Sequence, residues 1–401
     1  MNKNTVLKTE AENPLYRDMA DQLESLLRQS WADPNITFLE HQVRPAGRGG
    51  IISALTAQRC SPTLGIWRHS IRFRRSLHLD ENALDIVVKR KADDTILEKV
   101  ADQIGGMVHP LLQGKGRHLL RGLGLLGGAK REVALYREEQ LAQFRPATYG
   151  AEINPDRLGS VIAMECLTDD ELPDRWTSRH INAAIHGIAE VHAIAYKNPS
   201  AFYLCQREPT DNDLDPTPLF GLLSLMADAS RTKLSELLGE DCLALQTEIL
   251  GSLPAWWELR RVLPMTVIHN DFQPRNIAFR NGDDGSLKLC AFDWELTTVA
   301  PPEHDIAELL CFALPNHAHR NDVCGYLELH RKVIEEFSGH FVALAESERS
   351  FAYALKYLFI NRLSMYAMYL SIAPDSQLTN EELGAVFTNW QKLYSWFEMC
   401  E

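Results

Sequence analysis

Three polar side chains in the second half of the chain have types and a spacing that could carry out chemistry. Asp271 and Asn276 are five residues apart, and Asp293 follows an apolar run that has the pattern of a strand. Transfer of a phosphoryl group needs a carboxylate beside the attacking hydroxyl, and it needs oxygen ligands for the Mg²⁺ that binds the nucleotide phosphates. Two carboxylates and one amide meet these needs, so this segment is the candidate active site.

These side chains must be positioned by short strands and turns, because residues 266–294 lack the helical pattern of the sequence around them. The run Asn-Gly-Asp-Asp-Gly at 281–285 predicts a hairpin turn. A loop, a hairpin and a strand can bring Asp271, Asn276 and Asp293 to one point. From residue 178 onward, the rest of the chain predicts mainly helices, with many aromatic residues after 326.

The first half predicts an antiparallel sheet with helices. A helix is expected from residue 14, with Leu15, Met19, Leu23, Leu26 and Leu27 on one face. Even spacing of apolar residues predicts strands at 36–43, 51–57, 67–79, 83–91 and 159–167, and a helix is expected at 132–144. The fold class is therefore α+β, with an N-terminal domain over 1–166 and a helical C-terminal domain over 167–401. An acidic linker at 168–174 separates the two.

A basic, glycine-rich segment at 105–131 does not follow either pattern. It predicts a solvated flexible loop, because glycine-rich chains are flexible. An alternative hypothesis is a lid or a site for an anionic substrate, formed by Lys115, Arg117 and Arg121. Charge reversal at these positions would then raise the KM for the substrate.

Composition narrows the classes of protein. The chain has 401 residues and a formal net charge of −13, which argues against a nucleic-acid-binding surface over the whole molecule. No apolar run is long enough to span a membrane, and the first residues lack the pattern of a secretory signal. The eight cysteines form no C-x-x-C pair, so free thiols and a cytoplasmic location are expected. We therefore expect no membrane partner and no nucleic-acid partner.

The motifs in the second half resemble those of the aminoglycoside phosphotransferase/choline kinase family, which has a protein-kinase-like fold. His269-Asn270-Asp271 with Asn276 is similar to the H-[G/N]-D-x-x-x-x-N catalytic loop. Phe292-Asp293-Trp294-Glu295 resembles the I-D-[W/F/Y]-E motif, and residues 301–307 resemble the P-x-x-D-[L/I]-A element that contains Asp305. The resemblance is specific from 267 to 307 and weak before 170.

The resemblance implies a role for each of these residues. Asp271 would orient or deprotonate the acceptor hydroxyl, and Asn276 and Asp293 would bind Mg²⁺. His269 would pack the catalytic loop, and Asp305 would brace it. The role of Glu295 stays open between a metal ligand and a group that supports the ligands.

The first half fits the same family more loosely. Lys89 would hold the α- and β-phosphates and Glu132 would orient it, while a loop containing Gly47 and Gly49 would cover the nucleotide. Alternatives stay open, because Lys89 precedes two further basic residues on a strand edge and Glu132 competes with two nearby glutamates. The loop at 47–50 also fits an ordinary hairpin turn. The backbone of Met164, Glu165 and Cys166 would read the adenine.

The implied function is a two-lobed enzyme that transfers the γ-phosphoryl group of ATP to a hydroxyl of a small molecule. The residues do not distinguish ATP from GTP, and they do not identify the acceptor. An atypical protein Ser/Thr kinase is one alternative, although D-F-G, A-P-E and a recognisable activation segment are missing. A non-catalytic nucleotide-binding module is another, although the catalytic and metal residues are all present.

Overall fold

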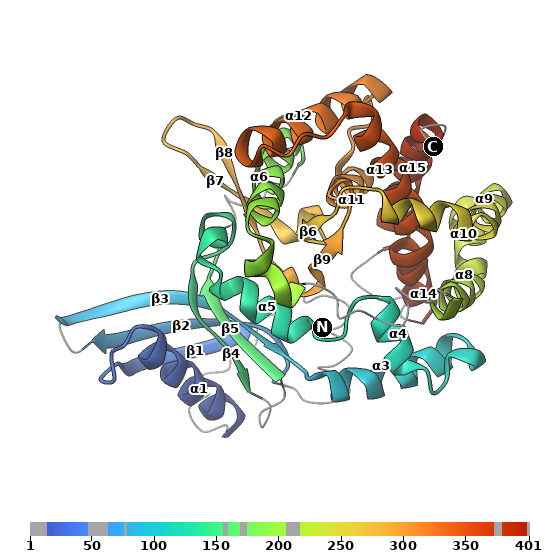
Figure 1. Cartoon of the computed structure of the whole chain (residues 1–401). Helices are drawn as coiled ribbons and strands as arrows, with labels where there is room; N and C mark the ends of the chain where they lie inside the picture. Colours follow the sequence, from blue (N-terminus) through green and yellow to red (C-terminus); the bar gives the residue numbers. More distant parts are fainter. Residues whose placement is uncertain are drawn as a thin grey trace. The chain divides into compact units, whose positions relative to one another are not determined.

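The computed structural model describes residues 14–46, 63–75, 78–154, 159–168, 175–205, 217–372 and 379–398. Backbone contacts divide the chain into two compact units (Figure 1). One comprises Met1–Val100 and Pro146–Leu167, and the other comprises Ala101–Arg145 and Thr168–Glu401. Residues 101–145, which the sequence analysis grouped with the sheet, belong to the second, mainly helical unit.

The first unit contains a five-stranded antiparallel sheet in the order β1-β2-β3-β5-β4. Its strands are β1 (Thr37–Pro45), β2 (Gly65–Arg75), β3 (His78–Lys91), β4 (Thr148–Asn154) and β5 (Gly159–Glu165). The strands predicted near 36–43, 83–91 and 159–167 are confirmed. The strand predicted at 67–79 has the wrong end, because β2 stops at Arg75 and β3 begins at His78. The strand predicted at 51–57 lies outside the described residues.

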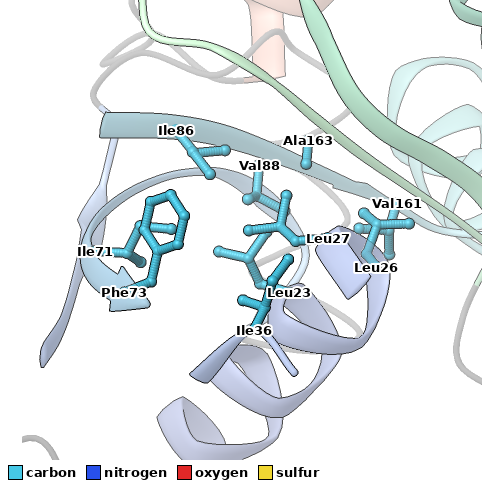
Figure 2. Close-up of a cluster of buried hydrophobic side chains, with 10 residues drawn as sticks. All are labelled: Leu23, Leu26, Leu27, Ile36, Ile71, Phe73, Ile86, Val88, Val161 and Ala163. Carbon is cyan, nitrogen blue, oxygen red and sulfur yellow. The ribbon is translucent and has the colours of Figure 1, made fainter. Parts of the chain in front are cut away.

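Helix α1 (Pro14–Ser30) packs on one face of this sheet. Leu23, Leu26 and Leu27 of α1 meet side chains of the strands in a cluster of buried apolar residues (Figure 2). The strand side chains in the cluster include Ile86 and Val88 of β3. Burial of one such leucine stabilises a fold by roughly 1.5–3 kcal/mol. The burial of Met19, Leu23, Leu26 and Leu27 confirms the predicted apolar stripe at these four positions, and the side chain of Leu15 lies outside the described part of the structure.

Contacts with α1 also show which way the basic residues of β3 point. Arg90 forms an ion pair with Asp18 of α1, with 3.8 Å between the guanidinium nitrogen and the carboxylate oxygen. Val88 faces the same helix. Because side chains alternate along a strand, Lys89 points to the opposite face of the sheet, where it is also buried.

The second unit is mainly helical and contains two small two-stranded sheets. Its helices are α4 (Gly116–Gly122), α5 (Gly128–Arg137), α6 (Ser178–Lys197), α8 (Thr217–Leu238), α9 (Glu240–Gly251), α10 (Leu253–Trp257), α11 (Glu303–Ala313), α12 (Arg320–Ser338), α13 (Leu344–Leu358), α14 (Ser364–Ile372) and α15 (Asn380–Phe397), with α3 (Asp94–Val108) leading into it. Strand β6 (Thr266–Ile268) pairs with β9 (Thr298–Ala300), and β7 (Ile277–Asn281) pairs with β8 (Leu287–Ala291).

The helices and the cysteines can be compared with the expectations of no membrane-spanning segment and of free thiols. Among the described helices, none combines the length and the apolar character needed to cross a membrane. Within the same residues, Cys166, Cys242, Cys290, Cys311 and Cys324 are free thiols.

The segment 105–131 is not the flexible loop that its glycines predicted. It contains the end of α3, all of α4 and the start of α5. Leu119 and Leu120 are buried, so apolar packing offsets the entropy cost of ordering this segment. Arg131 donates hydrogen bonds to the carbonyl oxygens of Leu126, Gly124 and Glu295. Its charge is therefore used within the fold. The proposed roles of the other basic residues stay predictions.

Two helical glycines give a matched test of packing in the second unit. A methyl group added at Gly187 of α6 would overlap the side chain of Leu289 on β8, whereas nothing lies within 4 Å of the same position at Gly221 of α8. We expect Gly187→Ala to lower the free energy of unfolding by about 1–3 kcal/mol. Gly221→Ala should raise it by about 0.5–1 kcal/mol, because alanine favours helix. Urea unfolding measures both, and equal effects would contradict this packing.

Candidate active site

Asp271 lies in the loop that connects β6 to β7 and is almost completely buried. Gln273 Nε2 donates to its Oδ1 at 2.5 Å, and Asn276 Nδ2 donates to its Oδ2 at 2.7 Å. The guanidinium of Arg275 lies 3.3 Å from Oδ2 and is itself partly exposed. Every group that contacts the carboxylate is thus a donor, so the site is built for an ionised Asp271.

The charges around Asp271 also favour its ionised form. Burial would raise the pKa of Asp271, but the positive charges of Arg275 and Arg362 outweigh burial, so this pKa lies below its ordinary value. The nearby charge of Asp293 acts in the opposite direction. An aspartate held in this way is a weak base, and its main capacity is to orient a donor such as a hydroxyl group.

Asn276 ends a single turn of 3-10 helix, η8 (Pro274–Asn276). Its amide nitrogen donates to the backbone oxygen of Asp271 at 2.8 Å and to the Asp271 carboxylate. Both amide protons are used in this way, so the carbonyl oxygen Oδ1 is the end of the side chain that is left for a cation. The backbone oxygen of Asn276 accepts from Phe292 N at 3.0 Å, which joins the loop to the residue before Asp293.

Asp305, in the first turn of α11, holds the backbone of the loop that contains Asp271. Asp305 Oδ1 accepts from the backbone N–H of Asn270, and Oδ2 accepts from that of His269, both at 2.8 Å. His192 of α6 also contacts Oδ2, at 3.1 Å. Asn270 has a left-handed backbone conformation (φ 60°), which few residues tolerate as well as asparagine. Its side chain donates to the backbone oxygen of Leu296 at 2.8 Å.

His269 is fully buried and connects the loop to the strand that carries Asp293. Its Nε2 lies 3.0 Å from the backbone oxygen of Phe292, so Nε2 bears the proton and donates. The ring packs against Trp294, with 4.4 Å between the ring centroids. In the structure, His269 therefore ties the catalytic loop to the residues on either side of Asp293.

Asp293 follows β8, and its backbone is also left-handed (φ 66°). Carboxylate oxygens of Asp293, Glu295 and Glu132 lie within 4.8 Å of one another, and Glu132 is buried. Three ionised carboxylates at this distance repel one another, and a bound cation would reduce this repulsion. The donors are all hard oxygens, which fits Mg²⁺ and does not fit a metal that prefers sulfur or imidazole.

Glu132 reaches this cluster from α5. Arg131, its neighbour on the same helix, donates to the backbone oxygen of Glu295 at 3.2 Å and so ties α5 to the turn after Asp293. From the family motifs in the sequence, Glu132 was expected only to orient Lys89. The cluster with Asp293 and Glu295 was not predicted, because nothing in the spacing along the chain joins 132 to 295.

The remaining predicted residues belong to the sheet unit. Lys89 lies on β3, between Ile66 of β2 and Ile162 of β5 in the register of the sheet. Met164 and Glu165 end β5, where Glu165 exchanges two hydrogen bonds with the backbone of Ala147. Cys166 follows as a half-buried thiol. Gly47 and Gly49 lie outside the described residues. The nucleotide-binding roles of all these residues stay predictions.

Two buried charged residues next to the loop were missed. Glu308 accepts from the backbone N–H of Phe272, and Arg362 donates to the backbone oxygen of Asn270. The available signal was a single charge inside an apolar helical run, Ile-Ala-Glu-Leu-Leu in one case and Phe-Ile-Asn-Arg-Leu in the other. Such a charge needs a buried partner, but the sequence does not show which one.

Comparison with known proteins identifies the family. The model of the phosphotransferase enzyme family, abbreviated APH, matches residues 130–330, just over half of the chain. The chain belongs to this phosphotransferase family. The matched residues include the catalytic loop, Asp293 and Asp305, so the resemblance seen in the motifs is confirmed, as is the α+β architecture with a small antiparallel sheet and a larger helical unit.

Solved structures of the same kind are similar over nearly the whole chain. One is a putative aminoglycoside phosphotransferase from Ralstonia eutropha, with 12% identity, a TM-score of 0.45, and coverage of 95% of this chain and 98% of that one. Another is the choline kinase LicA from Streptococcus pneumoniae, with 12% identity, a TM-score of 0.45, and coverage of 95% and 99%. A third is a spectinomycin phosphotransferase in complex with ADP and spectinomycin, with 10% identity, a TM-score of 0.44, and coverage of 95% and 98%. The search of curated proteins found no match.

Replacement of Asp305 by asparagine should lower stability in a pH-dependent way. An amide can accept only one of the two backbone N–H groups, so we expect the free energy of unfolding at pH 7 to fall by about 1.5–3 kcal/mol. Burial would raise the pKa of Asp305, but His192, His269 and backbone donors lower it below its ordinary value. The stabilisation is therefore present above the ordinary pKa of aspartate and is lost as the pH falls below it.

Urea unfolding at pH 7 and at pH 3, which is below the ordinary pKa of aspartate, tests this expectation. The gap between the wild type and Asp305→Asn should be widest at pH 7 and should shrink on acidification. Asp283→Asn, in the exposed hairpin turn, is the matched control and should change little at either pH. A gap that is constant across the range would contradict the role of an ionised Asp305.

Proposed function

We propose that this protein transfers the γ-phosphoryl group of a nucleoside triphosphate, ATP in the first instance, to a hydroxyl group of a small molecule. The observation that carries the proposal is the arrangement of the catalytic loop. The Asp271 carboxylate accepts from the Asn276 side chain, and Phe292, the residue before Asp293, is hydrogen-bonded to the backbone of Asn276 and to the ring of His269. Membership of a phosphotransferase family supports the same reaction class.

Asp271 would receive the hydrogen bond of the acceptor hydroxyl. The donors around its carboxylate and its lowered pKa favour the ionised form at neutral pH. Phosphoryl transfer has a loose transition state in which little proton transfer is needed early. Asp271 would therefore orient the oxygen for in-line attack and take up its proton late in the reaction.

Asn276 and Asp293 would hold Mg²⁺, with Glu295 and Glu132 close enough to contribute a ligand or to orient one. When bound, the ion neutralises charge on the nucleotide phosphates. The chain's own residues fix the two ligands relative to Asp271, because Phe292 bonds both to Asn276 and to His269. In this proposal Lys89 holds the α- and β-phosphates, and the backbone at 164–166 reads the base.

Asp271→Ala should strongly slow phosphoryl transfer. If Asp271 orients the acceptor, kcat should fall by about 10²-fold or more. A panel of amino alcohols, aminoglycosides and sugars, assayed for release of ADP or GDP, first identifies the acceptor. Labelled nucleotide then shows whether phosphate enters the small molecule or the protein.

Asp283→Asn is the control for this experiment, because the residue lies in an exposed turn. Urea unfolding confirms that each variant is folded. Turnover of a folded Asp271→Ala variant near that of the wild type would refute the assignment. Label that enters only protein would favour a protein kinase instead.

Asp293→Asn should weaken the binding of the divalent cation. Loss of a carboxylate ligand should lower the affinity for Mn²⁺, used as a spectroscopic substitute for Mg²⁺, by about tenfold or more in the presence of nucleotide. Electron paramagnetic resonance of free Mn²⁺ measures this without any need for turnover. Glu295→Gln and Glu132→Gln, compared under the same conditions, show which glutamate belongs to the site. Unchanged Mn²⁺ affinity in Asp293→Asn would contradict the metal assignment.

A further inference from the structure

Two buried charged residues contact the backbone on either side of Asp271. Glu308 lies on α11, one helical turn after Asp305, and is fully buried. Its Oε2 accepts from the backbone N–H of Phe272 at 2.9 Å. Arg362 lies in the turn of π-helix at Phe359–Leu363 and is 6% exposed. Its Nη2 donates to the backbone oxygen of Asn270 at 2.6 Å.

These two hydrogen bonds hold both peptide groups that Asp271 shares with its neighbours. The carbonyl of Asn270 belongs to the peptide bond before Asp271, and the N–H of Phe272 belongs to the one after it. Because peptide groups are planar, fixing both of them fixes the two backbone dihedrals of Asp271. The direction of its side chain from the backbone is set in the same way.

We propose that Glu308 and Arg362 are positioning residues that together clamp Asp271 in its reactive orientation through these two peptide groups. The inference rests on the proposed function in one respect, since Asp271 must be the residue that acts on the acceptor. It adds two residues to the site, one from α11 and one from the π-helical turn.

Burying Glu308 and Arg362 together costs folding free energy, so their presence is not explained by packing of the core alone. The Nε of Arg362 lies 3.8 Å from Glu308 Oε1, too far for a hydrogen bond, and Oε1 has no hydrogen-bond partner in the structure. Burial, and then the negative charge of Asp271, raise the pKa of Glu308, against the effect of Arg362. Apolar residues of similar volume would often be at least as stable as such a buried pair. A π-helical turn in an α-helical region also commonly marks a functional position.

A second buried glutamate on the same helix shows what a purely structural role looks like. Glu303 of α11 is also almost fully buried, and its two oxygens accept from the hydroxyls of Ser347 and Ser350 on α13, at 2.7 and 2.5 Å. These bonds join two helices and do not involve the catalytic loop. Glu303 is therefore a matched control for Glu308.

The experiment compares Glu308→Leu, which removes the acceptor, with Glu308→Gln, which keeps one, and with the control Glu303→Leu. Hydrogen–deuterium exchange of a peptide that covers 267–279 reports on the loop without any substrate. We expect faster exchange in Glu308→Leu, exchange near that of the wild type in Glu308→Gln, and no local change in Glu303→Leu. Loss of stability is measured for each variant by urea unfolding.

Kinetics provide the second measurement. Misplacement of Asp271 should lower kcat by about tenfold or more in Glu308→Leu, with the nucleotide KM changed by less than about twofold, because orientation acts in the transition state. Glu308→Gln should restore kcat to within about threefold of the wild type. Arg362→Met should lower kcat similarly, and the double variant Glu308→Leu/Arg362→Met should lose less than the product of the two single losses, since both act on one loop.

The outcomes separate this inference from the proposed function. If the wild type transfers phosphate to no acceptor, the proposed function fails, while exchange at 267–279 still supports or overturns the clamp. Equal exchange or an equal loss of kcat in Glu308→Leu and Glu303→Leu overturns the clamp even if phosphoryl transfer is established. The clamp is also overturned if Glu308→Gln loses as much kcat as Glu308→Leu.

Discussion

The candidate site depends on one buried carboxylate, that of Asp305, and on the two backbone N–H groups that it accepts. A buried carboxylate is stable only when its oxygens are hydrogen-bonded, so Asp305 requires the amides of His269 and Asn270 to point toward it. This forces the left-handed turn at Asn270 and places Asp271 immediately beyond it. His192 completes the set from α6, and its other ring nitrogen contacts His330 of α12 at 3.0 Å. Helices α6, α11 and α12 thus support the loop through one connected group of polar side chains.

The two aspartates of the site differ in what surrounds them, and this difference divides their roles. Asp271 is contacted by donors and lies near two arginines, so its negative charge is stabilised by the protein itself. Asp293 lies beside Glu132 and Glu295, and carboxylate oxygens of the three residues lie within 4.8 Å of one another. In the proposed function, the same residue type would therefore serve as an orienting group at Asp271 and as a cation ligand at Asp293. Arg275, four residues after Asp271, and Arg362 contribute the positive charge near Asp271.

Sequence patterns predicted the features of this protein that are determined by residues close together along the chain. The hairpin turn at 281–285, the strand with alternating Ile86 and Val88, and the leucine stripe of α1 follow from neighbours along the chain. The catalytic motif could be recognised because its residues are five positions apart. Glu308 and Arg362 could not be assigned, since their partners lie 36 and 92 positions away. The prediction for 105–131 was wrong because it weighed the glycines and not the burial of Leu119 and Leu120.

Contacts at the base of the β7–β8 hairpin, where the chain enters β7 and leaves β8, set the position of Asp293 relative to the catalytic loop. The length of the hairpin does not affect this position. Asn276 O accepts from Phe292 N where the hairpin begins and ends, Ile277 pairs with Ala291, and His269 contacts the backbone oxygen of Phe292. These contacts close the base of the hairpin, so residues near its exposed turn carry no constraint from the chemistry. It follows that the hydrogen bonds between Asp271 and Asn276 require their five-residue spacing, whereas the number of residues between Asn276 and Asp293 can vary in pairs without moving either residue.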